Sequence, residues 1–353
     1  MSTRFVHVTA DDVNNLKKKD VAKSTNAGTS NALKTFLAFC KEVNVYSINV
    51  ISKEQLRDLL AKFFAGARTE KGQLYKVNTM QAIRSGLQRH FMETRKIDII
   101  NDDFFQETNS CFHNILKNIR SSTKGQVKHY PEIEPEDLKK LYRSIDTNTP
   151  TGLLEKVWVD VMLHFIRRGR ENQREMTIDT FEMGVDASGK RFVGQSTGEV
   201  DKNHGALDET IGEGRMYETG KESCPVESFF KYISHLNPNQ LAFWQKPKEK
   251  WSSCDTIWYQ NAPLGPKSLG GMLAKLSLKY NLSQRYTNHS LRVTSLQALD
   301  DNNIDSCHII RVSGHKSQES IKTYARKLSA ARKRGISSIL SSIVEYCRWR
   351  LQK

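Results

Sequence analysis

Apolar side chains recur at the spacing of an α-helix along most of this chain, and this spacing constrains the fold more than any other feature. The first stripe follows the i, i+3, i+4, i+7 pattern of one helix face: Leu33, Phe36, Leu37 and Cys40. Stripes of the same kind predict helices over Lys53–Ala67, Asn78–Arg95 and Phe105–Ile119. A polar segment, residues 1–25, precedes them. We therefore expect a helical N-terminal domain over residues 26–120.

The stretch Ser121–Pro131 has the composition of a linker, because it is polar and basic and contains Gly and Pro. Beyond it, Pro135 followed by two acidic residues predicts the start of a helix. The segment Leu153–Ile166 is apolar enough to form a helix at the centre of a core. A chain of 353 residues can bury two such cores. We expect a second domain over residues 132–334, followed by a terminal segment, 335–353.

Strands are predicted in one part of the second domain. Arg191–Gln195 and Glu199–Lys202 flank Ser-Thr-Gly and predict a β-hairpin, whereas the Gly-rich, charged stretch Asn203–Lys221 predicts a loop. Helical patterns return in the ranges Pro225–His235, Leu269–Tyr280, His289–Asp300, Ile304–Val312, Gln318–Leu328 and Ile336–Leu351. The expected fold class is therefore mainly α with a small β-hairpin or sheet.

The chain is strongly basic, with a net charge of +15 and an isoelectric point near 9.5. Lys and Arg outnumber Asp and Glu both before and after residue 128. Such a balance suits a partner whose phosphates are held from two sides. Lysines on solvated helix faces would give the same charge, so charge supports a nucleic-acid partner without establishing one.

The six cysteines are scattered, with no C-x-x-C pair, which fits reduced thiols in a cytosolic or nuclear protein. Cys224, His235 and Cys254 do not have the spacing of a common zinc site, so we expect no metal. No apolar run approaches the ~20 residues of a membrane span, and the first residues lack the pattern of a signal peptide.

Two imidazoles, a guanidinium and a phenol fall close together near the end of the second domain: His289, Arg292, His315 and Tyr324. His289 and Arg292 are three residues apart and share one face of a helix. Ser313 and Gly314 can end a helix and begin a turn that presents His315. A helix from Gln318 then carries the hydroxyl of Tyr324 toward the same place. Together these groups can attack a phosphodiester without a metal ion.

The stretch from Tyr286-Thr-Asn-His-Ser-Leu-Arg292 through Ser313-Gly-His-Lys-Ser to Tyr324 resembles the tyrosine recombinase superfamily. It is most similar to the recombinases of Crypton-type DNA transposons and their host-adopted relatives. The resemblance implies a two-domain architecture, in which a helical N-terminal DNA-clamping domain precedes an α+β catalytic domain. The linker of such proteins lets the two domains close round a DNA duplex.

The resemblance also implies two arginines that neutralise the phosphate, for which a planar guanidinium is suited. Arg292 is one. The other lies in Phe165-Ile-Arg-Arg-Gly-Arg-Glu171. In the family an acidic residue follows the catalytic arginine by three positions, and Arg168 with Glu171 fits this rule, whereas Arg170 is the fallback. The doubled arginine departs from the Gly-apolar-Arg start that the family usually has.

The remaining roles also follow from the resemblance. A hairpin lysine protonates the departing 5′ oxygen, and Lys202 matches it, with Lys190 as the competitor. Tyr324 is the nucleophile, His289 accepts or relays its proton, and His315 donates to the scissile phosphate. The product is a 3′-phosphotyrosyl bond with a free 5′ hydroxyl, formed without a cofactor.

We therefore expect a nuclear, site-specific DNA recombinase or transposase that acts as a homo-tetramer on paired sites in double-stranded DNA. One side of the terminal segment is apolar and either packs on its own domain or docks on a neighbouring protomer: Ile336, Ile339, Leu340, Ile343, Val344 and Cys347. Two alternatives stay open. A type IB topoisomerase shares the chemistry, and a host-adopted relative can bind DNA without cutting it.

Overall fold

The computed structural model describes residues 8–9, 11–12, 23–122, 130–196, 213–315, 317–322, 333–335 and 337–338. Its contacts divide the chain into two compact units, Met1–Lys128 and His129–Lys353. The division falls inside the segment for which the sequence predicts a linker. Each unit has its own large cluster of buried apolar side chains.

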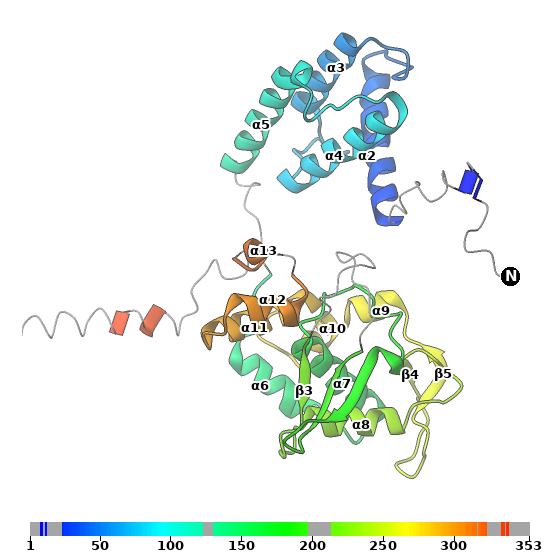
Figure 1. Ribbon diagram of the computed structural model, residues 1–353, viewed down its shortest axis with the longest axis vertical. Helices are drawn as coiled ribbons and strands as arrows, with labels where there is room; N and C mark the ends of the chain where they lie inside the picture. The colour runs from blue at the N-terminus through cyan, green and yellow to red at the C-terminus, as the bar shows by residue number, and fades with distance from the viewer. Residues whose placement is uncertain are drawn as a thin grey trace, which may run out of the picture. The chain divides into compact units, whose positions relative to one another are not determined.

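Between residues 23 and 122 the first unit consists of four helices and a short 3₁₀ turn (Figure 1): α2 Lys23–Glu42, α3 Lys53–Gly66, α4 Val77–Arg95, η1 Asp103–Phe105 and α5 Gln106–Ser121. The three later helices begin and end within two residues of the predicted ranges, because each carries a clear apolar stripe. Helix α2 packs on α4 and α3 packs on α5. Edge-to-face aromatic pairs fill the space between them, such as Phe36 with Phe63 and Phe64 with Phe112.

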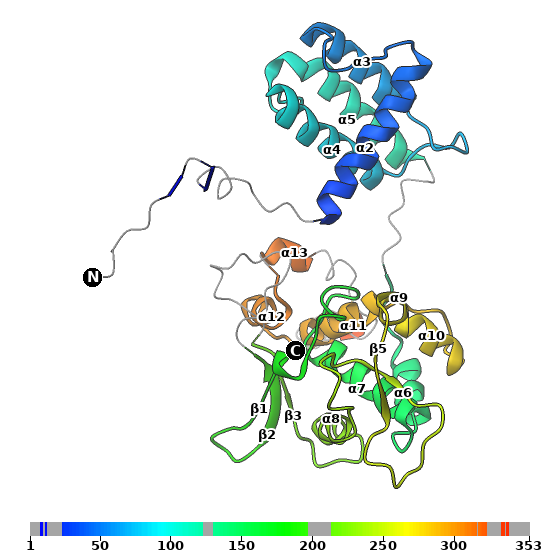
Figure 2. The ribbon, with the colours of Figure 1, turned by 90° about the vertical axis from the view of Figure 1, so that its right-hand side faces the viewer.

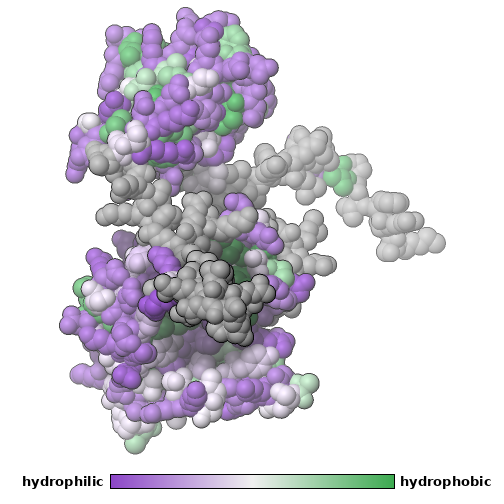
Figure 3. Space-filling model, turned by 90° about the vertical axis from the view of Figure 1, so that its left-hand side faces the viewer, coloured by the Kyte–Doolittle hydropathy of each residue, from purple (hydrophilic) through white to green (hydrophobic). Residues whose placement is uncertain are grey.

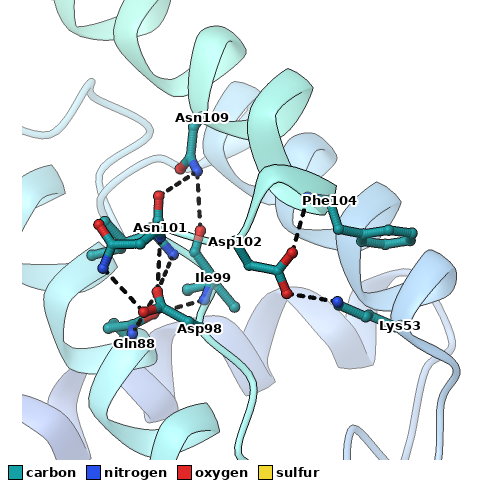
Figure 4. A network of polar contacts seen from close by, with 9 residues as sticks. Lys53, Gln88, Asp98, Ile99, Asn101, Asp102, Phe104 and Asn109 are labelled. Atoms are coloured by element: carbon teal, nitrogen blue, oxygen red, sulfur yellow. Dashed lines mark hydrogen bonds and ion pairs between the residues drawn. The ribbon is translucent and has the colours of Figure 1, made fainter.

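Local polar contacts fix where these helices begin. The Ser52 hydroxyl accepts from the backbone of Gln55, and the Gln55 side chain accepts from the backbone of Ser52, which forms a capping box. Figure 4 shows the corresponding network before α5. There Asp102 accepts from the backbone N–H of Phe104 at 3.0 Å and from Lys53 Nζ at 2.6 Å, which ties α3 to the start of η1.

The second unit is built round α7 (Pro150–His164), a helix buried on almost every side. It packs against α8 (Pro225–Ser234), α11 (Asn288–Asp301) and strand β4 (Gln245–Pro247), and α6 (Pro135–Ser144) belongs to the same unit. A helix buried all round is expected to be mostly apolar. Helix α7 nevertheless buries Lys156 and Asp160, which form an ion pair one turn apart, and Tyr142 donates to Asp160 at 2.8 Å.

Two small antiparallel sheets flank these helices. The first has the order β1-β2-β3, with β1 Phe181–Val185, β2 Arg191–Gln195 and β3 Arg215–Tyr217. It lies beside α8, as Figure 2 shows. The second pairs β4 (Gln245–Pro247) with β5 (Tyr259–Pro263).

The strand predictions need correction. The expected strand Arg191–Gln195 is β2, but its partners in the described residues are β1 and β3. The expected partner Glu199–Lys202 lies outside the described residues. The predicted loop over Asn203–Lys221 contains β3, because the side chain of Met216 is fully buried opposite Val193. The sheet β4-β5 was not predicted at all.

From residue 266 to residue 322 the described part of the second unit is mostly helical, as expected. The predicted helix Leu269–Tyr280 is in fact two, α9 (Pro266–Gly270) and α10 (Met272–Lys279), which meet at Gly271. Helices α12 (Ser306–Ser313) and α13 (Gln318–Lys322) follow α11. Almost all of the predicted terminal helix Ile336–Leu351 lies outside the described residues.

The described surface on the face drawn in Figure 3 is mostly hydrophilic, with small apolar areas. Among the described residues, none of the helices combines the length and the apolar character that crossing a bilayer requires.

Replacing Lys156 by Met should destabilise the second unit by about 3–5 kcal/mol, because it leaves the buried carboxylate of Asp160 without its cation. The matched control is Lys139→Met on α6, which removes an exposed pair with Glu136 and should change stability by about 0–1 kcal/mol. Chemical denaturation of the three proteins measures both differences. Equal losses would show that the buried pair is no more important than the exposed one.

Candidate active site

Helix α11 carries two of the predicted site residues, and its first turn is fixed from several sides. Asn288, at its first position, donates from Nδ2 to the carbonyls of Gly169 and Leu269, both at 2.7 Å. Its Oδ1 accepts from the backbone N–H of Leu273 at 3.0 Å. Three segments are thereby joined immediately before His289. A Cβ on Gly169 would lie 3.0 Å from the backbone nitrogen of His289, so the close approach requires glycine.

Arg292 lies one turn further along α11 and is only 2% exposed. Its guanidinium donates from Nη1 to the carbonyl of Ile166, just after α7, and from Nη2 to the carbonyl of Ser313 at 2.9 Å. The same Nη2 lies 3.0 Å from Nε2 of His315. A buried charge is tolerated only where hydrogen bonds replace its water shell, and here the ends of α7 and α12 supply them.

The turn after α12 presents His315, as the sequence predicts. Gly314 ends the helix in the left-handed region, with φ of 63°, and its N–H bonds back to the carbonyl of Ile310 at 2.9 Å. The hydroxyl of Ser313 lies 2.6 Å from Nδ1 of His315 and donates to the carbonyl of Ile309. Because that hydroxyl has one proton, the tautomer that satisfies both contacts of Ser313 carries its proton on Nδ1 and leaves Nε2 as an acceptor for Arg292.

The surroundings of His315 favour its neutral form. Burial is the largest cause, followed by the charges of Arg292 and Arg168, and together they lower the pKa of His315 from 6.5 to about 3. The pKa of His289 is also lowered, first by burial and then by the charge of Arg292.

Arg168 reaches the same turn from another segment. Its Nη1 pairs with Glu171 at 2.8 Å, and its Nη2 lies 3.5 Å from the carbonyl of Gly314. The guanidinium groups of Arg168 and Arg292 thus lie against neighbouring carbonyls of the turn that carries His315. Arg170, the fallback, is exposed and lines a hollow beside His289 instead.

His289 is half-buried at the start of α11. The ring of Tyr130 packs edge-on against its imidazole, with the ring centroids 4.9 Å apart. Tyr130 itself is 53% exposed and stands near the end of the predicted linker. Its contact with His289 was not predicted from the sequence.

The other predicted site residues are Lys202, its competitor Lys190, and Tyr324. Lys202 and Tyr324 lie outside the described residues. Lys190 is exposed in the turn between β1 and β2, where its backbone N–H donates to Asp186 at 3.0 Å. The described part of α13 reaches Lys322, and Ile321 on that helix belongs to a small buried cluster with Ile166, Leu296 and Ile309.

Ile166 occupies an unusual backbone conformation, with φ of 46°. The N–H of Arg167 bonds to the carbonyl of Met162 at 3.2 Å, and the N–H of Ile166 bonds to that of Leu163 at 3.3 Å, which is the Schellman pattern at the end of α7. Glycine normally fills this left-handed position, and a β-branched residue there is an outlier. Counted from Arg168, this is the glycine position of the Gly-apolar-Arg pattern.

One group of side chains among the described residues could share a metal ion. The ligand atoms of Asp305, Cys307 and His308, at the start of α12, lie within 4.8 Å of one another. All three side chains are exposed, and such groups commonly bind no ion. They are separate from the residues round Arg292.

Solved structures with a similar fold cover nearly the whole chain. The Tn1549 transposon integrase in complex with circular intermediate DNA matches 92% of this chain and 96% of its own, at a TM-score of 0.53 and 14% identity. A post-cleavage complex of the site-specific recombinase XerH with palindromic difH substrate matches 89% of this chain and 79% of its own, at a TM-score of 0.55 and 15% identity. The chain has the tyrosine recombinase fold.

Sequence relatives add little about activity. The human and mouse proteins named Uncharacterized protein KIAA1958 are each 20% identical over 294 residues. The match covers 77% of this chain but only 40% of each relative, so the chain spans about two fifths of their length. No family model matches the chain. The tyrosine recombinase fold therefore rests on the structural likeness.

Two organising residues of this fold escaped the sequence reasoning. Asn288 stands directly before the His-Ser-Leu-Arg motif, and a buried amide that joins three segments gives no periodic signal. Ile166 occupies the place where the motif usually has glycine, and that departure was the available sign of an unusual backbone.

At position 166, glycine should be better tolerated than alanine. Both Ile166→Gly and Ile166→Ala lose the buried side chain, but only glycine relieves the left-handed strain, so the Gly variant should be more stable by about 1 kcal/mol. At Ile309, inside α12, the order should reverse by about the same amount. Thermal and denaturant unfolding of the four variants compares them. If the alanine variant is more stable than the glycine variant at both positions, the backbone of Ile166 is not strained.

The lowered pKa of His315 should make stability depend on pH. The unfolded chain takes up a proton on this imidazole below pH 6.5, whereas the folded protein resists it down to about pH 3. The stability that neutral His315 contributes is therefore complete above pH 6.5 and is lost as the pH falls, with a slope of up to about 1.4 kcal/mol per pH unit.

Unfolding free energies of the parent protein and of His315→Gln, measured from pH 6.5 to 4.5, isolate this contribution. Both should fall as carboxylates titrate, but the parent should fall more steeply. His308→Gln, an exposed histidine on α12, is the control and should keep the parent slope. Parallel curves for the parent and His315→Gln would refute a neutral buried imidazole.

Proposed function

We propose that this chain is a site-specific DNA recombinase that cuts and rejoins DNA through a 3′-phosphotyrosyl intermediate, with Tyr324 as the nucleophile. The observation that carries the proposal is the convergence of Arg168 and Arg292 on the turn that presents His315. A phosphodiester resists attack because its oxygens are negatively charged, and two fixed guanidinium groups counter that charge. The DNA bound in the Tn1549 integrase structure supports the same proposal. The palindromic difH substrate in the XerH complex supports it as well.

In the proposed step, the Tyr324 oxygen bonds to phosphorus, and the bond from phosphorus to the 5′ oxygen breaks. The phenol proton passes to His289, which suits this role because burial and Arg292 lower its pKa and keep it neutral at pH 7. Lys202 protonates the departing 5′ oxygen. A substrate with a bridging sulfur at that position tests Lys202, because a thiolate leaves without an acid and should rescue Lys202→Ala.

His315 would turn toward the phosphate when DNA binds. Its Nε2 lies 3.0 Å from Nη2 of Arg292, which can only donate, so a neutral Nε2 gains a proton before it donates to the phosphate. The incoming phosphate offsets the two arginine charges that help to lower the pKa of His315, and this favours protonation. His315 would then donate to a non-bridging oxygen.

The partner is double-stranded DNA, and we propose that four protomers exchange four strands in the nucleus, as in a Crypton-type element. The terminal segment 335–353 would dock on the next protomer. Mass photometry on paired sites counts the protomers, with and without residues 336–353. A type IB topoisomerase would instead relax a supercoiled plasmid as a monomer, without paired sites.

The phenol of Tyr324 should be required for covalent attachment to DNA. A nicked duplex should leave parent protein on its 3′ side in a denaturing gel, and Tyr324→Phe should abolish the adduct while keeping DNA affinity. Tyr130→Phe is the control, because it removes another phenol close to His289. An adduct that survives in Tyr324→Phe would exclude this nucleophile. Parent protein that binds DNA but never forms the adduct would favour a non-catalytic DNA-binding protein.

The two converging arginines should affect cleavage far more than binding. Arg168→Ala and Arg292→Ala should each lower the cleavage rate by about 10²–10³, since many other Lys and Arg share the contacts to DNA. Single-turnover cleavage and equilibrium binding separate the two effects. The cleavage rate of Arg170→Ala should lie closer to that of the parent protein than the rates of the other two variants do. If Arg170→Ala abolishes cleavage and Arg168→Ala does not, the catalytic arginine is Arg170.

A further inference from the structure

A hollow of about 690 Å³ opens beside His289, within the second unit. Residues from four segments line it, including Tyr130, Arg170, Gly270, Gly271, Arg285 and His289. No acidic residue is among the described residues that line it. Its wall extends from His289 to Ala274 on α10.

The floor of the hollow is held in place. Asn288 joins the carbonyl of Gly169 to the carbonyl of Leu269, so the segment that carries Arg170 is tied to the α9–α10 junction. The aliphatic part of Arg170 lies over Gly270, where an added Cβ would be 3.5 Å from Arg170 Cγ. Arg170 is therefore in van der Waals reach of this junction.

Two guanidinium groups face this space. Arg170 and Arg285 are both exposed, and neither is paired with a carboxylate of the described residues. Because guanidinium groups bind phosphate with two parallel hydrogen bonds, and because the glycines let a backbone approach closely, the hollow is suited to a phosphodiester. The Tyr130 ring adds an aromatic surface for the attached sugar or base.

We propose that this hollow binds a second phosphodiester of the DNA strand, next to the one that is cut. The inference rests on the proposed function, since it takes the scissile phosphate to lie between Arg168, Arg292 and His315. Arg170 and Arg285 then fix the position of the strand, and His289 stands between the two phosphates.

The salt dependence of DNA binding tests the charge. Each of Arg170→Gln and Arg285→Gln should reduce the slope of log affinity against log salt by about 0.9 and weaken binding roughly five-fold at 0.15 M salt. Arg143→Gln, an exposed arginine on α6 away from the hollow, is the matched control and should keep the parent slope. Slopes of both hollow variants equal to that of Arg143→Gln would overturn the inference.

Duplexes with a single neutral methylphosphonate locate the phosphate. Fluorescence anisotropy should find one position, next to the scissile phosphate, at which neutralisation weakens the parent protein but not the doubly substituted Arg170→Gln, Arg285→Gln variant. If that position is the scissile phosphate itself, the hollow is part of the cleavage site and the inference is wrong. This measurement reports binding and does not require cleavage. A protein that shows the expected binding pattern but never cleaves DNA would therefore refute the recombinase proposal, while the inferred phosphate site in the hollow would stand.

Discussion

The buried charge of Arg292 is the constraint on which the rest of the second unit depends. Removing a cation from water costs several kcal/mol, which must be recovered from hydrogen bonds of about 1.5–3 kcal/mol each. Here the acceptors are backbone carbonyls at the ends of α7 and α12. Both helices must therefore end at fixed places relative to α11. The turns that end α7 and α12 are therefore needed to stabilise the buried charge of Arg292.

Neighbouring contacts maintain that geometry. The hydroxyl of Tyr286 donates to Asp137 at 2.7 Å, and Thr294 accepts from the backbone of Ile133 at 2.8 Å, so α11 is bound to the segment round the start of α6. Asn288 adds the α9–α10 junction. Because these groups come from distant parts of the sequence, the position of His289 is set by tertiary contacts and not by the helix alone.

The sequence pattern was sufficient to predict those elements whose structure depends mainly on their own residues. The apolar spacing of amphipathic helices such as α3 and α5 predicts them directly, and the Ser313-Gly314 pair correctly predicts the turn before His315. Short strands behave differently. The three residues of β3 form a strand only because β2 offers a partner and a buried place for Met216. The left-handed backbone of Ile166 has the same origin, since only the surrounding packing holds it there.

The cluster of Ile166, Leu296, Ile309 and Ile321 is separate from the main core of the second unit. Within the described residues, Ile321 is the buried apolar side chain that α13 contributes to it. Burying one such side chain stabilises by about 1.5–3 kcal/mol. The buried contact that holds α13 is therefore separate from the core round α7, and weakening it would leave the packing of α7 unchanged.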